Sequence, residues 1–223
     1  MFFIILLFLS KLFILGLEAE IQINKLIPLN NPWSITFIDK DNLLITEKKG
    51  NIKLYNLKEK EIYKITHNLN IYNAGQGGLL DIIYRDKFIW VSYSEKLKNS
   101  FSRTSIAKSK LDTKTLNFKN IFEAYPPINS GYHFGARLVL KDDYIFASLG
   151  ERGKEMISQD GMKHPGSIIR IFNDGRVPSN NPGLINKINW LPEIYQIGLR
   201  NPQGLELSPF NKKIYVTNHG AKG

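Results

Sequence analysis

One histidine lies in a segment suited to proton transfer. Residues 130–137 read Ser-Gly-Tyr-His-Phe-Gly-Ala-Arg, so His133 lies between two glycines and just before the apolar run 138–140. An imidazole, with an ordinary pKa of about 6.5, can accept a proton at neutral pH. The other three histidines lack such a setting. We therefore interpret His133 as a candidate general base.

Two further glycine-rich segments carry polar side chains suited to ligand binding. Residues 75–81 contain Gln76, whose amide both donates and accepts hydrogen bonds, among glycines that permit tight turns and close approach to a ligand. Residues 198–205 place Arg200 beside Asn201, and this pair can bind a planar anionic ligand. Taken singly, each segment is also compatible with an ordinary turn, and Arg200 with a salt bridge.

Several other functional classes have no signature in this sequence. It contains no P-loop, no dinucleotide-binding glycine fingerprint, no His-Glu-x-x-His zinc spacing and no Gly-x-Ser-x-Gly nucleophile elbow. The net charge is +10, but the lysines are spread through turns, without a basic helix or an aromatic RNA-binding motif. We predict that the protein does not bind nucleic acid.

Short β-branched and aromatic runs must position these loops. After residue 20 the chain lacks a useful amphipathic helical pattern, and its apolar runs are bounded by Gly, Asn, Asp and Pro. One pattern, an apolar run followed by a polar turn, starts at Leu43, Phe88, Tyr144 and Ile214, at intervals of 45, 56 and 70 residues. Propeller blades recur every ~40–50 residues, or further apart where loops are inserted. The pattern predicts an all-β chain with a β-propeller fold.

Residues 20–223 form one predicted domain, with room for about four to five blades at that period. The chain has no cysteine, so packing, chain closure or bound ions must stabilise it. A propeller removes exposed sheet edges by closing its ring. We therefore expect an incomplete propeller, truncated at its C-terminal end, that aggregates or pairs with a complementing C-terminal fragment.

Residues 1–19 resemble a signal peptide. Residues 1–16 are almost wholly apolar, Lys11 is their only charged side chain, and Ala19 offers a small residue before a cut. The apolar stretch is shorter than the roughly 20 residues of a membrane-spanning helix. We predict a periplasmic or secreted protein, with an uncleaved membrane anchor as the alternative.

In this order, the three loops resemble the soluble quinoprotein glucose and aldose sugar dehydrogenases. Further matching segments lie at residues 32–37, 44–47, 149–153, 166–175 and 216–220, so the resemblance covers residues 30–223. It implies a six-bladed propeller. It also implies an enzyme that oxidises the anomeric hydroxyl of an aldose sugar to a lactone, with pyrroloquinoline quinone and calcium as cofactors.

The resemblance implies a role for His133 and for Glu151. His133 would contact the sugar and take its hydroxyl proton while hydride moves to the quinone. Glu151 falls where the family commonly has an aspartate that orients this histidine. The longer side chain of Glu151 puts that hydrogen bond in question.

The cofactor ligands follow in the same way. Gln76 would hold the cofactor or the sugar, and Arg200 and Asn201 would contact the quinone, with Arg200 also facing the sugar and stabilising negative charge. Calcium would be bound partly by the backbone carbonyls of Gly220 and Ala221, although the family usually has proline at the second position.

Part of the family pattern lies beyond this sequence. After Gly223 the family continues with an acidic calcium-binding stretch and with cationic residues that bind the cofactor carboxylates. We therefore expect the chain by itself to have little or no activity. The alternatives are a non-catalytic propeller fragment that binds sugar or protein, and an unrelated propeller hydrolase such as a lactonase. The particular aldose, the electron acceptor and the oligomeric state stay open.

Overall fold

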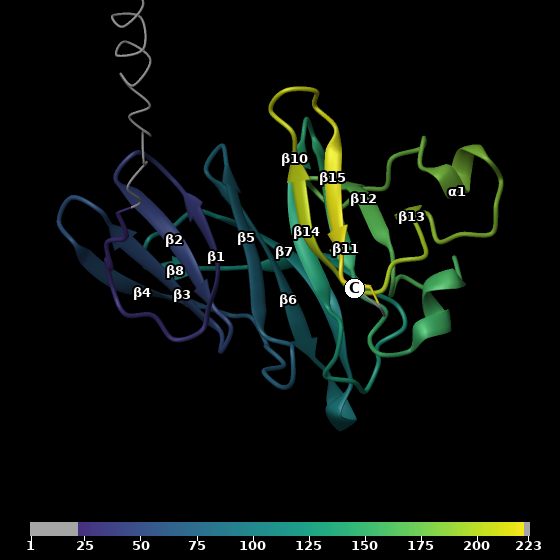
Figure 1. Ribbon diagram of the computed structural model, residues 1–223, viewed down its shortest axis with the longest axis horizontal. Coiled ribbons are helices and arrows are strands. Elements are labelled where there is room, and N and C mark those ends of the chain that lie inside the picture. The colour runs from purple at the N-terminus through teal and green to yellow at the C-terminus, as the bar shows by residue number, and fades with distance from the viewer. Residues whose placement is uncertain (1–21, 221–223) are drawn as a thin grey trace, which may run out of the picture.

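The computed structural model describes residues 22–220. Its regular secondary structure is almost all β-strand, and nearly all strand pairs are antiparallel (Figure 1). The predicted signal peptide, residues 1–19, and the predicted calcium ligand Ala221 lie outside the described residues. No helix within residues 22–220 is long and apolar enough to cross a membrane.

The strands form four successive sheets. The first contains β1 (Pro32–Phe37), β2 (Asn42–Glu47), β3 (Asn51–Asn56) and β4 (Glu61–His67), to which β8 (Thr115–Leu116) adds in parallel. The second contains β5 (Leu79–Arg85), β6 (Phe88–Lys96), β7 (Ser102–Lys110) and β9 (Lys119–Glu123).

The third sheet contains β10 (Gly135–Lys141), β11 (Tyr144–Leu149), β12 (Ile168–Phe172) and β13 (Ile194–Gln196). The fourth is a hairpin of β14 (Pro202–Leu207) and β15 (Ile214–Asn218). Helical structure in the described residues is limited to three short pieces, η1 (Lys98–Ser100), η2 (Glu155–Gln159) and α1 (Pro182–Ile185).

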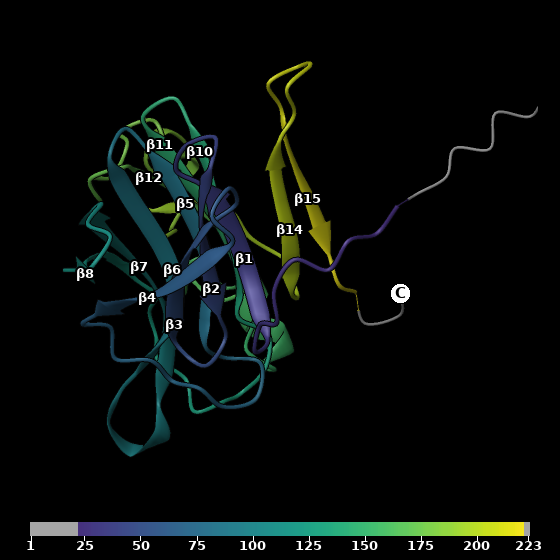
Figure 2. The same cartoon turned by 90° about the vertical axis from the view of Figure 1, so that its left-hand side faces the viewer.

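Hydrophobic layers fill the space between successive sheets. Leu44 of the first sheet and Ile82 of the second belong to one buried cluster, and Trp90 of the second sheet and Ile169 of the third belong to another. A smaller cluster joins the third sheet to Leu205 of the hairpin. Figure 1 shows the sheets side by side, and Figure 2 shows the β14–β15 hairpin at one side of the molecule. This stacking of sheets face to face is the arrangement of a propeller.

The first strand of each sheet lies innermost, and a polar network joins these four strands. Asp81 on β5 accepts hydrogen bonds from the Ser34 hydroxyl of β1 at 2.6 Å and from the Leu138 N–H of β10 at 2.8 Å. Arg137, also on β10, lies 3.6 Å from Asp81 and donates to the carbonyl of Gln203 on β14 at 2.9 Å. One buried carboxylate and one guanidinium thus connect all four inner strands.

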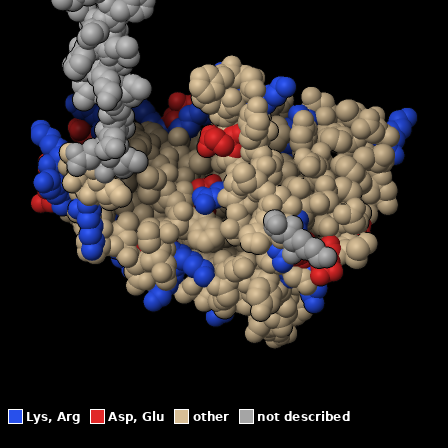
Figure 3. Space-filling view, in the orientation of Figure 1, with Lys and Arg blue, Asp and Glu red and all other residues tan. Residues whose placement is uncertain are grey.

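A hollow opens between these inner strands. It has a volume of about 390 Å³, and its lining includes Ser34, Asp81, Arg137, Gln203 and Glu206. Figure 3 shows a small group of acidic and basic side chains near the centre of this face, surrounded by uncharged residues. The hollow corresponds to the axial channel of a propeller.

The all-β propeller prediction is confirmed, and the sequence repeat has a structural explanation. The predicted repeat positions Leu43, Phe88, Tyr144 and Ile214 fall in β2, β6, β11 and β15, the second strand of each sheet. The count of four to five blades is not confirmed, because residues 22–220 form one five-stranded sheet, two four-stranded sheets and one hairpin. Long connections, such as residues 150–167 and 173–193, use chain that the count had assigned to strands.

Candidate active site

The loops that precede three inner strands meet at one end of the propeller. Gln76 precedes β5, His133 precedes β10, and Arg200 and Asn201 precede β14, while Glu151 follows β11. Hydrogen bonds connect Gln76, His133, Glu151 and Arg200, and Asn201 bonds to Gly135 at the end of the histidine loop. The structure therefore brings together the loops that carry every predicted catalytic and cofactor-binding side chain, although these residues are up to 125 positions apart in the sequence.

His133 and Glu151 form a contact pair. The imidazole Nδ1 meets Oε1 of Glu151, whose side chain is only 2% exposed, whereas that of His133 is 13% exposed. The second carboxylate oxygen accepts the backbone N–H of Lys154. No protein group within residues 22–220 bonds to Nε2 of His133. The longer glutamate thus reaches the histidine, and the other ring nitrogen is left open.

The backbone of His133 is held in an uncommon conformation. Its φ is 46°, in the left-handed region, which costs a non-glycine residue on the order of 1–3 kcal/mol unless the surroundings enforce it. Gln76 supplies part of that enforcement, because its Oε1 accepts the His133 N–H at 2.8 Å. The Gln76 N–H in turn donates to the carbonyl of Gly131 at 2.7 Å. Gln76 therefore positions the histidine loop as well as lining the site.

Two glycines are required where the loops touch. A Cβ on Gly150 would collide with the carbonyl of His133, and one on Gly75 would collide with the carbonyl of Gly131. Gly75 also has a φ of 57°. The glycine-rich composition that suggested ligand loops thus serves, at these two positions, the close packing of one loop on another.

Arg200 and Asn201 make different kinds of contact. Asn201 is buried, and its Oδ1 accepts the N–H of Gly135 at 3.2 Å. The carbonyl of Arg200 accepts the N–H of Glu151 at 2.8 Å, whereas the hydrogen bonds of its guanidinium within residues 22–220 are long contacts, at 3.4 Å, to His219. Asn201 therefore fixes the base loop, and the guanidinium of Arg200 has no short hydrogen bond within these residues.

The predicted calcium ligands are only partly within the described chain. The carbonyl of Gly220 lies 3.1 Å from Nδ1 of its neighbour His219, and Ala221 lies outside the described residues. Residues 22–220 contain no group of three or more His, Cys, Asp or Glu side chains that could hold a metal ion. Calcium prefers six to eight oxygen ligands, and its assignment to Gly220 and Ala221 stays a prediction.

Arg152 was not predicted as a site residue. Its guanidinium is buried beneath the histidine loop and bonds to carbonyl oxygens of that loop. Its neighbours Glu151 and Gly153 stood out by resemblance, but an isolated arginine in a sequence carries no signal of burial. Arginine is mostly exposed in proteins, so only the tertiary structure could reveal it.

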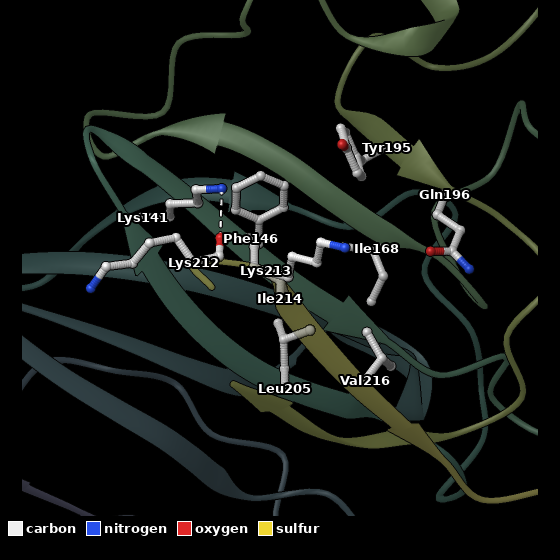
Figure 4. A pocket seen from close by; sticks show the side chains of 10 residues that line it. All are labelled: Lys141, Phe146, Ile168, Tyr195, Gln196, Leu205, Lys212, Lys213, Ile214 and Val216. Carbon is white, nitrogen blue, oxygen red and sulfur yellow. Dashed lines mark hydrogen bonds between the residues drawn. The ribbon is translucent and has the colours of Figure 1, made fainter. Parts of the chain in front are cut away.

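A second hollow lies away from these residues. It separates the third sheet from the hairpin, and its lining includes Lys141, Phe146, Tyr195, Lys213 and Val216 (Figure 4). Lys141 is the last residue of β10, whereas His133 precedes the first. This groove is therefore not part of the candidate active site.

The fold and the loop cluster define a propeller with a polar, enzyme-like site at one end of its inner strands. The chain belongs to the glucose/sorbosone dehydrogenase family, whose model matches residues 29–223. The aldose sugar dehydrogenase YliI of Escherichia coli is 31% identical over 205 residues, covering 87% of this chain and 55% of that protein. The predicted family is thus confirmed. The chain spans about half the length of the curated relatives that it matches.

Solved structures of related proteins have the same fold. The soluble aldose sugar dehydrogenase of Escherichia coli, in its apo form, superposes with a TM-score of 0.82 at 29% identity, covering 87% of this chain and 59% of that one. The PQQ-bound aldose sugar dehydrogenase of Streptomyces coelicolor superposes with a TM-score of 0.70 at 23% identity, covering 86% of this chain and 57% of that one. The latter likeness supports the fold alone.

Proposed function

We propose that this chain carries the base and part of the cofactor site of a quinoprotein that oxidises the anomeric hydroxyl of aldose sugars to lactones. One observation carries the proposal, namely the contact between Nδ1 of His133 and the buried carboxylate of Glu151, with Nε2 left open. Membership of the glucose/sorbosone dehydrogenase family supplies the reaction class.

The pair suits proton abstraction. Glu151 accepts a hydrogen bond from Nδ1–H, so the tautomer that remains has a lone pair on Nε2. That nitrogen takes the proton of the anomeric hydroxyl as the C1–H bond breaks, and the carboxylate stabilises the imidazolium that forms. The hydroxyl oxygen loses the proton and C1 loses the hydride, so C1 becomes the carbonyl carbon of the lactone.

The hydride requires an acceptor. Pyrroloquinoline quinone, when bound, would supply a two-electron acceptor at this site. The side chains fit an anionic, planar group, because the Arg200 guanidinium makes only long contacts, to His219, within residues 22–220 and the Gln76 side chain lies against the base. We assign Arg200 to binding the cofactor and to stabilising the negative charge that develops on it. Gln76 and Arg200 would also contact the sugar. The calcium roles of Gly220 and Ala221 stay predictions, and no step is routed through them.

Because we expect residues 1–223 alone to have little or no activity, the test uses the chain extended with the downstream reading frame, supplied with Ca²⁺ and pyrroloquinoline quinone. Aldose-dependent reduction of a dye is measured over a panel of sugars, and quinone binding is followed separately by absorbance. His133→Gln should lower kcat roughly 10²–10⁴-fold, as expected for loss of a general base, with quinone binding retained. His67→Gln, in the first sheet, is the matched control and should keep wild-type activity.

The outcomes separate the candidate functions. Quinone binding without turnover of any aldose would contradict the enzyme assignment and would favour a sugar- or protein-binding role. Hydrolysis of a lactone without quinone would favour a hydrolase. Wild-type activity in His133→Gln would show that another group takes the proton.

A further inference from the structure

Arg152 is a buried cation that contacts two separate parts of the chain. Its Nε donates to the carbonyl of Tyr132 at 3.0 Å, and one Nη2 hydrogen bond goes to the carbonyl of Ser130. The same guanidinium donates to the carbonyl of Ser102 at 3.2 Å and to its hydroxyl at 2.9 Å. Arg152 therefore joins the histidine loop to the first residue of β7 in the second sheet.

The contacts of Arg152 surround His133. The backbone N–H of Arg152 donates to the carbonyl of His133 at 3.3 Å. Its guanidinium carbon lies 3.7 Å from the centre of the Phe134 ring, a cation–π contact. Arg152, which is 2% exposed, thus contacts oxygens of residues 130, 132 and 133 and the ring of residue 134.

The charge of Arg152 is satisfied by dipoles. It forms no ion pair with any carboxylate in residues 22–220, and its polar contacts are carbonyl and hydroxyl oxygens. Burial lowers the pKa of Arg152 to about 10, so the guanidinium stays charged at neutral pH. A buried cation is costly unless its hydrogen bonds are satisfied, and two of its four oxygen partners lie on the loop that carries the base.

We propose that Arg152 is a positioning residue that holds His133 in its left-handed backbone conformation and its imidazole against Glu151. This inference rests on the proposed function for its catalytic meaning, but the anchoring itself can be measured without turnover. A planar fork of donors is needed, because the acceptors lie on both sides of the guanidinium. A lysine could reach only some of them.

The test compares Arg152→Met and Arg152→Lys with wild type. Hydrogen exchange of the backbone N–H groups of His133 and Gly135, which donate to Gln76 and Asn201, reports the loop directly. We expect exchange to rise about tenfold or more in Arg152→Met, because four buried oxygens lose their donors, and to rise less in Arg152→Lys. In the active protein, kcat should fall about 10–100-fold with little change in KM, as expected when a base is misplaced rather than binding lost.

Arg103→Met is the matched control. Arg103 is next to Ser102 but bonds to Glu95 and Glu123 instead. Its loss should lower thermal stability without changing exchange at His133.

Each result has one reading. Wild-type exchange at His133 in either folded Arg152 variant overturns the proposal, whatever happens to activity. If Arg152→Met does not fold, Arg152→Lys decides by the same measurement. Raised exchange in a protein whose wild type oxidises no aldose supports the anchoring and rejects the proposed function instead.

Discussion

The backbone N–H of Glu151 donates to the carbonyl oxygen of Arg200 at 2.8 Å. One hydrogen bond therefore joins the residue that contacts the imidazole to the loop that carries the guanidinium. Since Glu151 follows the third sheet and Arg200 precedes the hairpin, the distance between base and cation depends on how these two sheets pack.

Replacement of Glu151 tests the charge beside the base. Glu151→Gln keeps the shape of the side chain but removes the charge that would stabilise a protonated imidazole, so kcat should fall roughly 10²–10⁴-fold. Glu151→Asp keeps the charge but shortens the side chain, so kcat should fall less than in Glu151→Gln. Steady-state kinetics of sugar oxidation provide the measurement. Glu155→Gln, at an exposed position, should be neutral, and equal losses in the two Gln variants would argue against a specific role.

Asn201 should contribute to stability as well as to any ligand contact. Asn201→Ala removes the acceptor for the buried Gly135 N–H, and an unpaired buried donor costs about 1–3 kcal/mol. Urea unfolding should show a decrease of that size in the free energy of unfolding. Asn117→Ala, at an exposed position, is the control. No loss of stability in Asn201→Ala would mean that the Gly135 N–H finds another partner.

Asp81 should be a main determinant of stability. Asp81→Asn turns one carboxylate oxygen into a donor, which then faces either the Ser34 hydroxyl or the Leu138 N–H. The mismatch at a buried site should lower the free energy of unfolding by about 1–3 kcal/mol. Asp86→Asn is the control, since its carboxylate is 88% exposed. If both variants unfold at the same urea concentration, the network does not stabilise the inner strands.

The sequence predicted best those elements whose side chains are buried on both faces. Strands β2, β6 and β11 have almost continuous buried runs, so their apolar residues formed the repeat visible in the sequence. The inner strand β14 reads Pro-Gln-Gly-Leu-Glu-Leu and has only two buried residues, Pro202 and Leu205, while Gln203 and Glu206 line the axial hollow. Such a strand gives only a weak hydrophobic pattern in the sequence, so it is recognised as a strand only from its pairing in the sheet.

The site divides in a similar way. Gln76, His133 and Arg200 were found because glycines and resemblance mark their loops. The anchoring contacts of Arg152 and Asp81 join segments tens of residues apart, and neither residue type indicates burial. Nothing local in the sequence determines these contacts, because they depend on how the sheets stack.

A half-buried histidine in the first sheet, His67, should make stability depend on pH. His67 donates from Nε2 to the carbonyl of Gly50 at 2.7 Å, and its Nδ1 accepts the N–H of Leu69 at 3.3 Å. A second proton on the ring, at Nδ1, would face the Leu69 N–H. Burial lowers the pKa of His67, and the nearby charge of Lys64 lowers it further. The unfolded chain therefore binds a proton more readily than the folded chain.

The sign of the effect follows from that difference. The contribution of His67 is fully present above its unfolded pKa of about 6.5 and is lost as the pH falls through that value toward the lowered folded pKa. Between pH 7 and pH 5 the free energy of unfolding should fall, by at most about 1.4 kcal/mol per pH unit for one proton. His67→Gln cannot be protonated, so the difference between wild type and variant in urea unfolding isolates this histidine. A difference that does not change with pH would show that His67 titrates alike in both states.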